Sequence, residues 1–223
     1  MVDKFINIFE GLKRAHGCTY INSVPKNGAK LKTKSFVKRE IVTRQHFEDH
    51  LNGIEPTLGI IPINEEDLCK WGCIDIDSYA GFDHKKLLNK IHTLELPLVV
   101  CRSKSGGAHI FLFIKEYVEV KIVRDKLNQI KAILGFGNAE VFPKQIELKS
   151  EEDTGNFLNL PYFQGNKTTR YAFKIDGTAA NLEEFYSLYE CYSVKPKDVA
   201  NIQLKRVESE FKDGPPCIEI LAT

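Results

Sequence analysis

The chain has 223 residues, 43% of them hydrophobic, which is enough for one large domain or two small ones with a substantial core. The net charge of +1 excludes a uniformly basic protein, so a polyanionic partner has to be met by a local patch. Six cysteines without a CxxC pair argue against a zinc ribbon or a redox motif, and no apolar run reaches membrane-spanning length. We therefore expect a cytoplasmic protein with reduced thiols.

Residues 1–70 predict an N-terminal α/β module. Apolar residues recur at helical spacing within residues 3–16, which indicates an amphipathic opening helix. The lysine-rich stretch 25–40 surrounds a turn signal and predicts a solvated hairpin, with contact to a nucleic-acid backbone as the alternative. A further helix is expected over residues 43–53.

Residues 71–195 show a regular alternation of strand and helix patterns. Their order, β-α-β-β-α-β, is typical of the split βαβ fold, also called ferredoxin-like or RRM-like, so the expected class is α+β. In this topology the first and third strands are central neighbours and the fourth strand flanks the first. Strands are expected at 72–77, 97–102, 108–114 and 139–142, and helices at 84–95, 120–134 and 181–192.

Two aspartates interrupt the first of these strands, in the stretch GCIDIDSY. Asp75 and Asp77 share one strand face because side chains alternate with period 2. Two like charges about 7 Å apart raise each other's pKa unless a cation lies between them. The pair is therefore costly as structure alone and indicates a cation site.

The topology brings further polar residues to these aspartates. His109 on the third strand and Glu140 at the start of the fourth are expected on either side of the first strand. If Glu140 points to the same face, three carboxylates converge beside a histidine. Oxygen ligands of this kind suit Mg²⁺ or Mn²⁺, and two such ions would activate a hydroxyl nucleophile and stabilise a leaving pyrophosphate.

The turn RSKSGGAH between the second and third strands indicates a polyanion site. Its glycines allow backbone N–H groups to approach a phosphate closely, and its polar side chains add hydrogen-bond donors. Alone, each feature has a simpler structural explanation: a surface DxD pair, a core histidine, a solvated glutamate and an ordinary turn. Their convergence favours a triphosphate held by the turn, the histidine and the metals. The donors of the turn are Arg102, Ser103, Lys104 and Ser105.

The ordered segments GCIDID, CRSKSGGAHIFLF, EVFPKQ and GNFLNLPYFQG give the chain a specific likeness. Across residues 57–173 it resembles the catalytic domain of archaeo-eukaryotic primases, in particular the primase-polymerases of phages, plasmids and mobile elements. The resemblance implies that Asp75, Asp77 and Glu140 bind two catalytic ions, Mg²⁺ or Mn²⁺. It also implies that His109 and the preceding turn contact the triphosphate of the incoming nucleotide.

Two departures from the family pattern qualify this transfer. Gly107 lies two positions before the histidine, where the family often has serine, so that role passes to Ser105 or to a backbone amide. The third acid is commonly aspartate, whereas here it is Glu140, with Glu147 as the competing candidate.

The resemblance also suggests outer contacts of the site. Lys144 and Gln145 are candidates for phosphate or template contacts, and Asn156 and Asn159 for the nucleotide pocket. Selection at the sugar 2′ position is assigned to Asn159 or Tyr162.

The leading hypothesis is therefore a DNA primase and polymerase that makes and extends primers on a single-stranded DNA template from nucleoside triphosphates. Residues 196–223 resemble a linker toward a helical domain, and we expect a fragment of a longer protein that works with a helicase. A phage or mobile element is the expected source, acting in the cytoplasm of a host cell.

Two other classes of function remain open at this point. Glu147 and Lys149 have the E-x-K spacing of a metal-dependent nuclease, although this explanation leaves His109 and the glycine-rich turn without a role. A non-catalytic RRM-like module would bind single strands through sheet aromatics, and Phe111 and Phe113 share the face of His109 by parity. Such a module has no use for three acids on that face.

Overall fold

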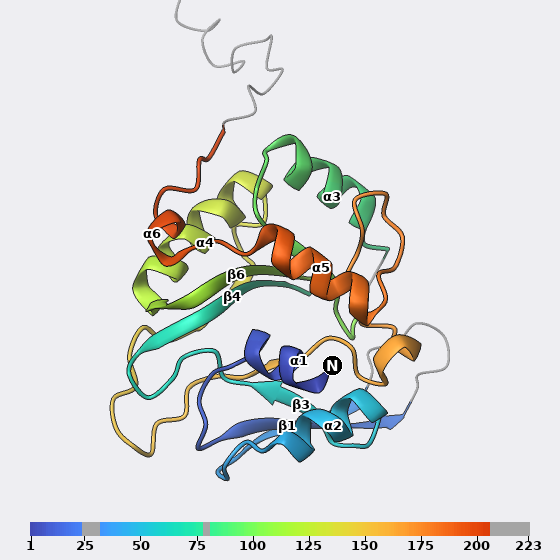
Figure 1. Cartoon of the computed structure of the whole chain (residues 1–223), viewed down its shortest axis with the longest axis vertical. Helices are drawn as coiled ribbons and strands as arrows, with labels where there is room; N and C mark the ends of the chain where they lie inside the picture. The colour runs from blue at the N-terminus through green and yellow to red at the C-terminus, as the bar shows by residue number, and fades with distance from the viewer. Residues whose placement is uncertain (24–31, 78–80, 206–223) are drawn as a thin grey trace, which may run out of the picture.

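A computed structural model describes residues 1–23, 32–77 and 81–205 and shows two four-stranded antiparallel sheets, one above the other in Figure 1. The first sheet has the strand order β2-β1-β3-β8. Its central strand β1 pairs with β2 on one side and with β3 on the other. Its strands are β1 (His16–Ser23), β2 (Lys32–Lys38), β3 (Thr57–Ile60) and β8 (Leu158–Asn159).

The second sheet has the order β5-β6-β4-β7, and its strands all run antiparallel to their neighbours. The first strand of the unit, β4, thus lies between the third and the fourth, as the split βαβ topology requires. The predicted order of elements and the α+β class are confirmed. The strands are β4 (Leu68–Ile76), β5 (Val99–Arg102), β6 (Ala108–Glu119) and β7 (Glu140–Phe142).

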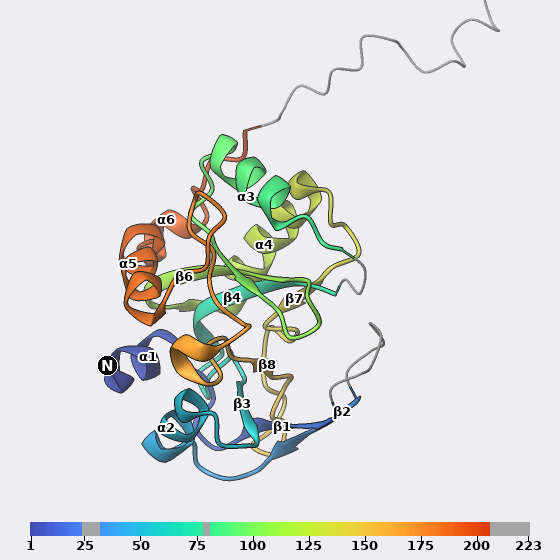
Figure 2. The same ribbon diagram turned by 90° about the vertical axis from the view of Figure 1, so that its right-hand side faces the viewer.

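Helices cover both faces of the second sheet. The crossover helices α3 and α4 lie together on one face, and α1 and α5 lie against the other (Figures 1 and 2). Helix α2 packs beside β3 in the lower half of the molecule. The helices are α1 (Val2–Ile8), α2 (Arg44–Asn52), α3 (His84–Thr93), α4 (Val120–Leu134), α5 (Leu182–Tyr192) and α6 (Pro196–Val199), with a short 3₁₀ turn at Gly165–Lys167. Within the described ranges, none of these helices has the length and apolar character needed to cross a bilayer.

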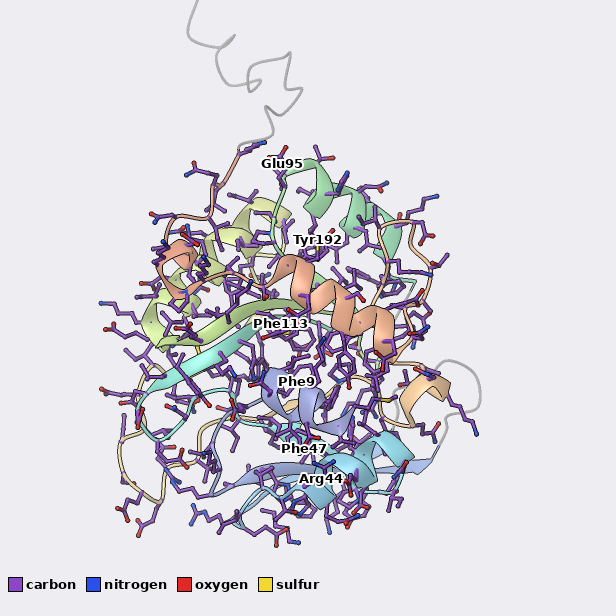
Figure 3. All side chains as sticks on the ribbon, in the orientation of Figure 1. Phe9, Arg44, Phe47, Glu95, Phe113 and Tyr192 are labelled. Atoms are coloured by element: carbon purple, nitrogen blue, oxygen red, sulfur yellow. The ribbon has the colours of Figure 1, made fainter. Side chains whose placement is uncertain are left out.

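Aromatic side chains join the two halves of the molecule. The ring of Phe9 lies 5.7 Å from the rings of Trp71, Phe111 and Phe113, and 6.0 Å from that of Phe185 on α5. In Figure 3, Phe113 and Phe9 lie between the second sheet and the first. Edge-to-face and stacked pairs at these distances add to the stabilisation from burial of their apolar area. Leu58 and Ile60 of β3 belong to the same buried cluster as these rings, so one shared core joins the two sheets.

The elements differ from the predicted ones mainly at their ends. Helix α1 ends at Ile8, well before residue 16, because the chain then runs tightly against the end of β3. Leu12 N–H donates to the Ile61 carbonyl oxygen at 2.9 Å, and a Cβ at Gly11 would lie only 2.0 Å from that oxygen. Strand β6 continues to Glu119, five residues beyond its predicted end at 114.

The predicted hairpin in the lysine-rich stretch is confirmed as the antiparallel pair β1 and β2. Its turn, including Lys26 and Lys30, lies outside the described residues, as does most of the expected linker, residues 206–223. The expected boundaries after residues 70 and 195 stay predictions. Residue 70 falls inside β4, so this strand belongs to both of the units that the sequence suggested.

Candidate active site

The face of the second sheet that is turned away from α3 and α4 is apolar in its middle and polar at one end. In its middle it carries the buried rings of Trp71, Phe111 and Phe113. Towards the end of β4 the same face carries Asp75 and, on the neighbouring strand, His109. Strand alternation makes this a single continuous face, apolar where helices cover it and polar at one end.

Asp75 occupies the centre of the polar end. It lies directly opposite His109 on β6 and, on its other side, directly opposite Glu140 on β7. Directly opposed residues of antiparallel strands share a face, so the expectation that Glu140 points to the face of Asp75 is met by the register. The ladder of backbone hydrogen bonds thus aligns an acid, a histidine and a second acid in one row.

The carboxylate of Asp75 is largely enclosed. Its side chain is 19% exposed, and Oδ1 lies 3.4 Å from His109 Nε2. This oxygen is buried and accepts no hydrogen bond from any described residue. A buried polar atom without a partner costs free energy, which explains why such atoms are rare in the absence of a functional role. A cation is the partner that would satisfy Oδ1 best.

The predicted phosphate turn lies against the second aspartate. Ser105 Oγ donates to Asp77 Oδ1 at 3.4 Å, and the hydroxyls of Ser103 and Ser105 are 3.0 Å apart. Gly106 has φ +94°, a conformation that L side chains rarely adopt, and Ser103 N–H donates to the Gly107 carbonyl oxygen at 3.0 Å. The turn is therefore tight, and it faces the acids.

Glu140 is brought to the site by its backbone but its carboxylate is turned outward. The side chain is 60% exposed and forms an ion pair with Lys144 at 2.6 Å. Among the described residues, the one group of three potential ligands whose atoms all lie within 4.8 Å of one another is elsewhere, at His16, Glu40 and His46. Asp75 and Glu140 thus share a face, Asp77 follows directly after β4, and all three offer the carboxylate oxygens that Mg²⁺ and Mn²⁺ prefer, but their ligand atoms are not gathered.

Two basic side chains of the turn point away from the acids. Arg102 precedes the turn on the opposite face of β5, and its Nη1 donates to the Thr169 carbonyl oxygen at 3.3 Å. Lys104 reaches across to the first sheet, where its Nζ donates to Thr33 Oγ1 at 3.4 Å. The phosphate roles of both residues stay predictions.

Thr33 belongs to a polar face of the first sheet. Thr19 and Ser35 share this face and contact each other through their hydroxyls at 2.9 Å. Thr57 donates to Asn159 Oδ1 at 3.3 Å on the same face, so the predicted pocket residue Asn159 lies on the surface that Lys104 approaches. The first sheet therefore presents hydroxyl and amide groups towards the turn.

The other predicted outer residues are less well placed. Tyr162 is fully buried, and its hydroxyl donates to the Ala180 carbonyl oxygen at 2.9 Å and accepts from Ala172 N–H at 3.1 Å. The suggestion that Tyr162 reads the sugar is therefore wrong. Gln145 and Asn156 hydrogen-bond to each other at 2.9 Å.

The E-x-K segment lies at the far end of β4. Leu148 N–H donates to Asp67 Oδ1 at 2.8 Å, and Asp67 directly precedes β4. Asp75 is eight residues further along, about 25 Å at the rise of an extended strand. This distance argues against Glu147 as the third acid and against the nuclease explanation, which needs Glu147 and Lys149 beside Asp75 or Asp77.

The aromatic pair required by the RRM-like explanation is also not available. Phe111 and Phe113 do share the face of His109, but they are 0% and 1% exposed. Phe9 and Phe185 cover them, so no base can stack on their rings.

Sequence reasoning missed a histidine that supports the turn. His84, the first residue of α3, contacts the Gly107 carbonyl oxygen through Nε2 at 3.0 Å. The contact joins residues 23 positions apart, so no local pattern could have indicated it.

Two neighbouring thiols, Cys73 and Cys101, lie under the site on the same face, and burial raises the pKa of both, which keeps them neutral.

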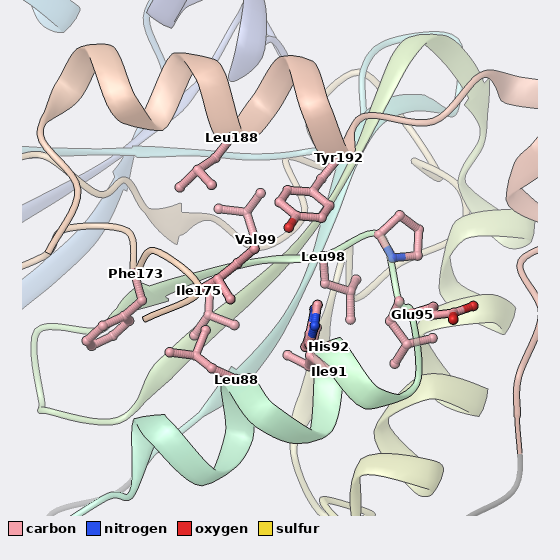
Figure 4. Close-up of a pocket in the computed structure, with 13 residues that line it drawn as sticks. Leu88, Ile91, His92, Glu95, Leu98, Val99, Phe173, Ile175, Leu188 and Tyr192 are labelled. Atoms are coloured by element: carbon pink, nitrogen blue, oxygen red, sulfur yellow. The ribbon is translucent and has the colours of Figure 1, made fainter. Parts of the chain in front are cut away.

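A cavity of about 320 Å³ lies outside this site, between α3 and α5 (Figure 4). Leu88 and Ile91 of α3 face Leu188 of α5 across it. Its polar side chains are His92, Glu95 and Tyr192, and it contains none of the predicted site residues. The candidate site is thus an open polar surface and not this apolar cavity.

Comparison with known protein families identifies the family to which this arrangement belongs. The chain matches a family model described as "TOTE conflict system, Archaeo-Eukaryotic Primase domain" over residues 15–202, most of its length. This span begins just before β1 and ends after α6, so it includes both sheets and the polar row of Asp75. A search of curated proteins found no match.

Proposed function

Since the chain belongs to the archaeo-eukaryotic primase family, as a domain of the TOTE conflict-system type, we propose that it catalyses template-dependent nucleotidyl transfer on DNA. Members of this superfamily are primase-like nucleotidyltransferases in general. The proposed reaction makes and extends primers from nucleoside triphosphates on a single-stranded template. The observation that carries the proposal is the row of Asp75, His109 and Glu140 with the unpartnered oxygen of Asp75 at its centre.

Divalent metal fits this row because its donors are carboxylates, one of which lacks a partner. We assign Asp75, Asp77 and Glu140 as the ligands of Mg²⁺ or Mn²⁺. When bound, two such ions lower the pKa of the attacking 3′-hydroxyl and neutralise the leaving pyrophosphate. Glu140 is exposed and its ion pair is with the half-buried Lys144, so its carboxylate can rotate towards Asp75 at little cost.

The turn and His109 are assigned to the triphosphate. Ser105 presents its hydroxyl beside Asp77, the buried Ser103 contacts that hydroxyl at 3.0 Å, and His109 Nε2 lies beside the Asp75 carboxylate. A triphosphate placed here accepts hydrogen bonds from these donors, which hold its α-phosphate next to the acids. Positioning of this kind is the main contribution that a protein makes to phosphoryl and nucleotidyl transfer.

The template strand is assigned to the space between the turn and the first sheet. Lys104 spans this space to Thr33, and Lys144 lies beside Glu140 on the opposite side of Asp75 from His109. Lysine side chains at these positions attract a phosphate backbone without reading its sequence. Asn159 and its neighbours supply the polar surface on which a nucleotide sugar or base would lie.

The test is nucleotide incorporation on single-stranded DNA with Mg²⁺ or Mn²⁺, with and without an annealed primer. The Asp75→Asn/Asp77→Asn variant is compared with Asp125→Asn, which changes an exposed aspartate on α4 away from the site. We expect products that lengthen with time for the wild type and Asp125→Asn, and none for the double variant. Equal products from all three proteins, or no product from any, would contradict the proposal, and a shortened template would indicate a nuclease.

A further inference from the structure

A second cluster of potential metal ligands lies at the first sheet. His16 is the first residue of β1, Glu40 follows β2, and His46 lies in the first turn of α2. Glu40 Oε1 is 3.1 Å from His16 Nε2 and 3.3 Å from His46 Nε2. The ligand atoms of all three residues lie within 4.8 Å of one another. Three separate segments of the chain thus direct metal-binding atoms to one point.

His16 is oriented as a ligand by its surroundings. The side chain is 2% exposed, and its Nδ1 lies 3.5 Å from the Gly17 carbonyl oxygen. Without metal, Nε2–H donates to Glu40 Oε1; with a metal on Nε2, the ring proton lies on Nδ1 and points to the Gly17 carbonyl oxygen. Ligating histidines are commonly oriented in this way by a carbonyl oxygen behind the ring.

The ring of His46 is held by Thr43. Its Nδ1 lies 3.0 Å from Thr43 Oγ1 and also 3.0 Å from Thr43 N. Without metal the ring accepts the Thr43 N–H; with metal on Nε2, Nδ1–H donates to the Thr43 hydroxyl instead.

We propose that His16, Glu40 and His46 bind one transition-metal ion of the Zn²⁺ class, with water as the fourth ligand. Two imidazoles and one carboxylate are a zinc-type donor set, distinct from the all-carboxylate row at Asp75. The ion would join β1, the end of β2 and α2, and so brace the base of the hairpin against the helix. This inference does not rest on the proposed nucleotidyl transfer.

Lys38 is the competitor for this site. Its Nζ lies 2.6 Å from Glu40 Oε1, the same oxygen that His16 Nε2 contacts. Lys38 is 53% exposed and can leave the carboxylate when a metal arrives. If the cluster is only a set of ion pairs, removing Lys38 takes away its main cation. If it is a metal site, removing Lys38 takes away a positive charge that repels the metal ion. Replacing Lys38 therefore separates the two explanations.

The experiment titrates Co²⁺ and then Zn²⁺ into untagged protein carrying Asp75→Asn/Asp77→Asn, which removes two of the three predicted catalytic ligands. Co²⁺ in a four-coordinate site gives strong visible absorption, and Zn²⁺ is followed by its displacement of Co²⁺. We expect one ion per chain. Affinity should fall about tenfold or more in Glu40→Gln and in His46→Gln, persist in His92→Gln on α3, and stay equal or rise in Lys38→Met.

Circular dichroism of each variant establishes that it is folded, and the two ligand variants are independent, so that one suffices if the other unfolds. Zn²⁺ should also raise the melting temperature of the parent but not of Glu40→Gln. No absorption in the parent, or equal affinity in the parent and both ligand variants, would overturn the proposal. Loss of binding in Lys38→Met would overturn it as well.

Discussion

His109 on β6 lies directly opposite Asp75 on β4, and its Nε2 is 3.4 Å from Asp75 Oδ1. The backbone hydrogen bonds between β4 and β6 set this relationship. On its other edge β4 pairs with β7, which places Glu140 on the other side of Asp75. A row held by strand pairing is rigid, in contrast to one built on loops. Preorganisation of this kind lowers the cost of orienting a triphosphate.

Asp75→Asn should separate activity from stability. The amide keeps the shape of the carboxylate but removes its charge, so we expect nucleotide incorporation to fall about 100-fold or more. The melting temperature should not fall, because the buried Oδ1 has no hydrogen bond to lose in the described structure. Primer extension and thermal unfolding of the same preparation provide the two measurements. A large loss of stability would show that Asp75 has a structural role.

Glu140 and Glu147 offer a matched comparison between two glutamates. Glu140→Gln should lower incorporation by about 100-fold, whereas Glu147→Gln should leave it within about twofold, because Glu147 lies at the far end of β4. Both side chains are exposed, so neither change should alter the melting temperature by more than a few degrees. Activities in the opposite order would move the third acid to residue 147.

Phe113→Ala tests the aromatic face of the sheet. The ring is 1% exposed and packs on Phe9, Phe185 and Tyr189. Truncation should therefore cost about 3–5 kcal/mol of unfolding free energy, as for other buried phenylalanines. Denaturant unfolding measures this loss. Affinity for single-stranded DNA should stay unchanged while the variant remains folded, and a selective loss of DNA binding at full stability would favour base stacking.

The order of the strands and the position of Asp75 could be predicted because both follow from local periodicity. The alternation in β4 and the apolar stripes of α3 and α4 define the split βαβ unit, and its topology places His109 and Glu140 beside Asp75. The family match over residues 15–202 is consistent with the resemblance seen in the motifs.

Beyond the hairpin of β1 and β2, the first sheet could not be predicted in the same way. Its strands β3 and β8 have four and two residues, too few for a periodic pattern, and they pair across almost one hundred positions of sequence. The hydrogen bond from the Tyr162 hydroxyl to the Ala180 carbonyl oxygen could not be predicted either, because the two residues belong to different segments of the chain. Contacts that long-range pairing creates leave no local signal.

His50 should make the stability of the protein depend on pH. The ring is fully buried between α2 and β3, where Nδ1 accepts Leu58 N–H at 3.1 Å and Nε2 lies 2.8 Å from the Pro161 carbonyl oxygen. Burial lowers its pKa from 6.5 to about 3. As the pH falls, the unfolded chain therefore binds a proton before the folded protein does. The neutral ring's contribution is complete above pH 6.5 and is lost as the pH falls towards 3.

Between pH 7 and pH 5, this difference should lower the free energy of unfolding by about 2 kcal/mol. Urea unfolding at both pH values measures the change. The His50→Gln variant should be less stable than the wild type at pH 7 but should lose less stability on acidification, because it has no ring to protonate. His92→Gln is the control, since His92 is exposed on α3. An equal pH dependence in the wild type and His50→Gln would show that other groups control the acid sensitivity.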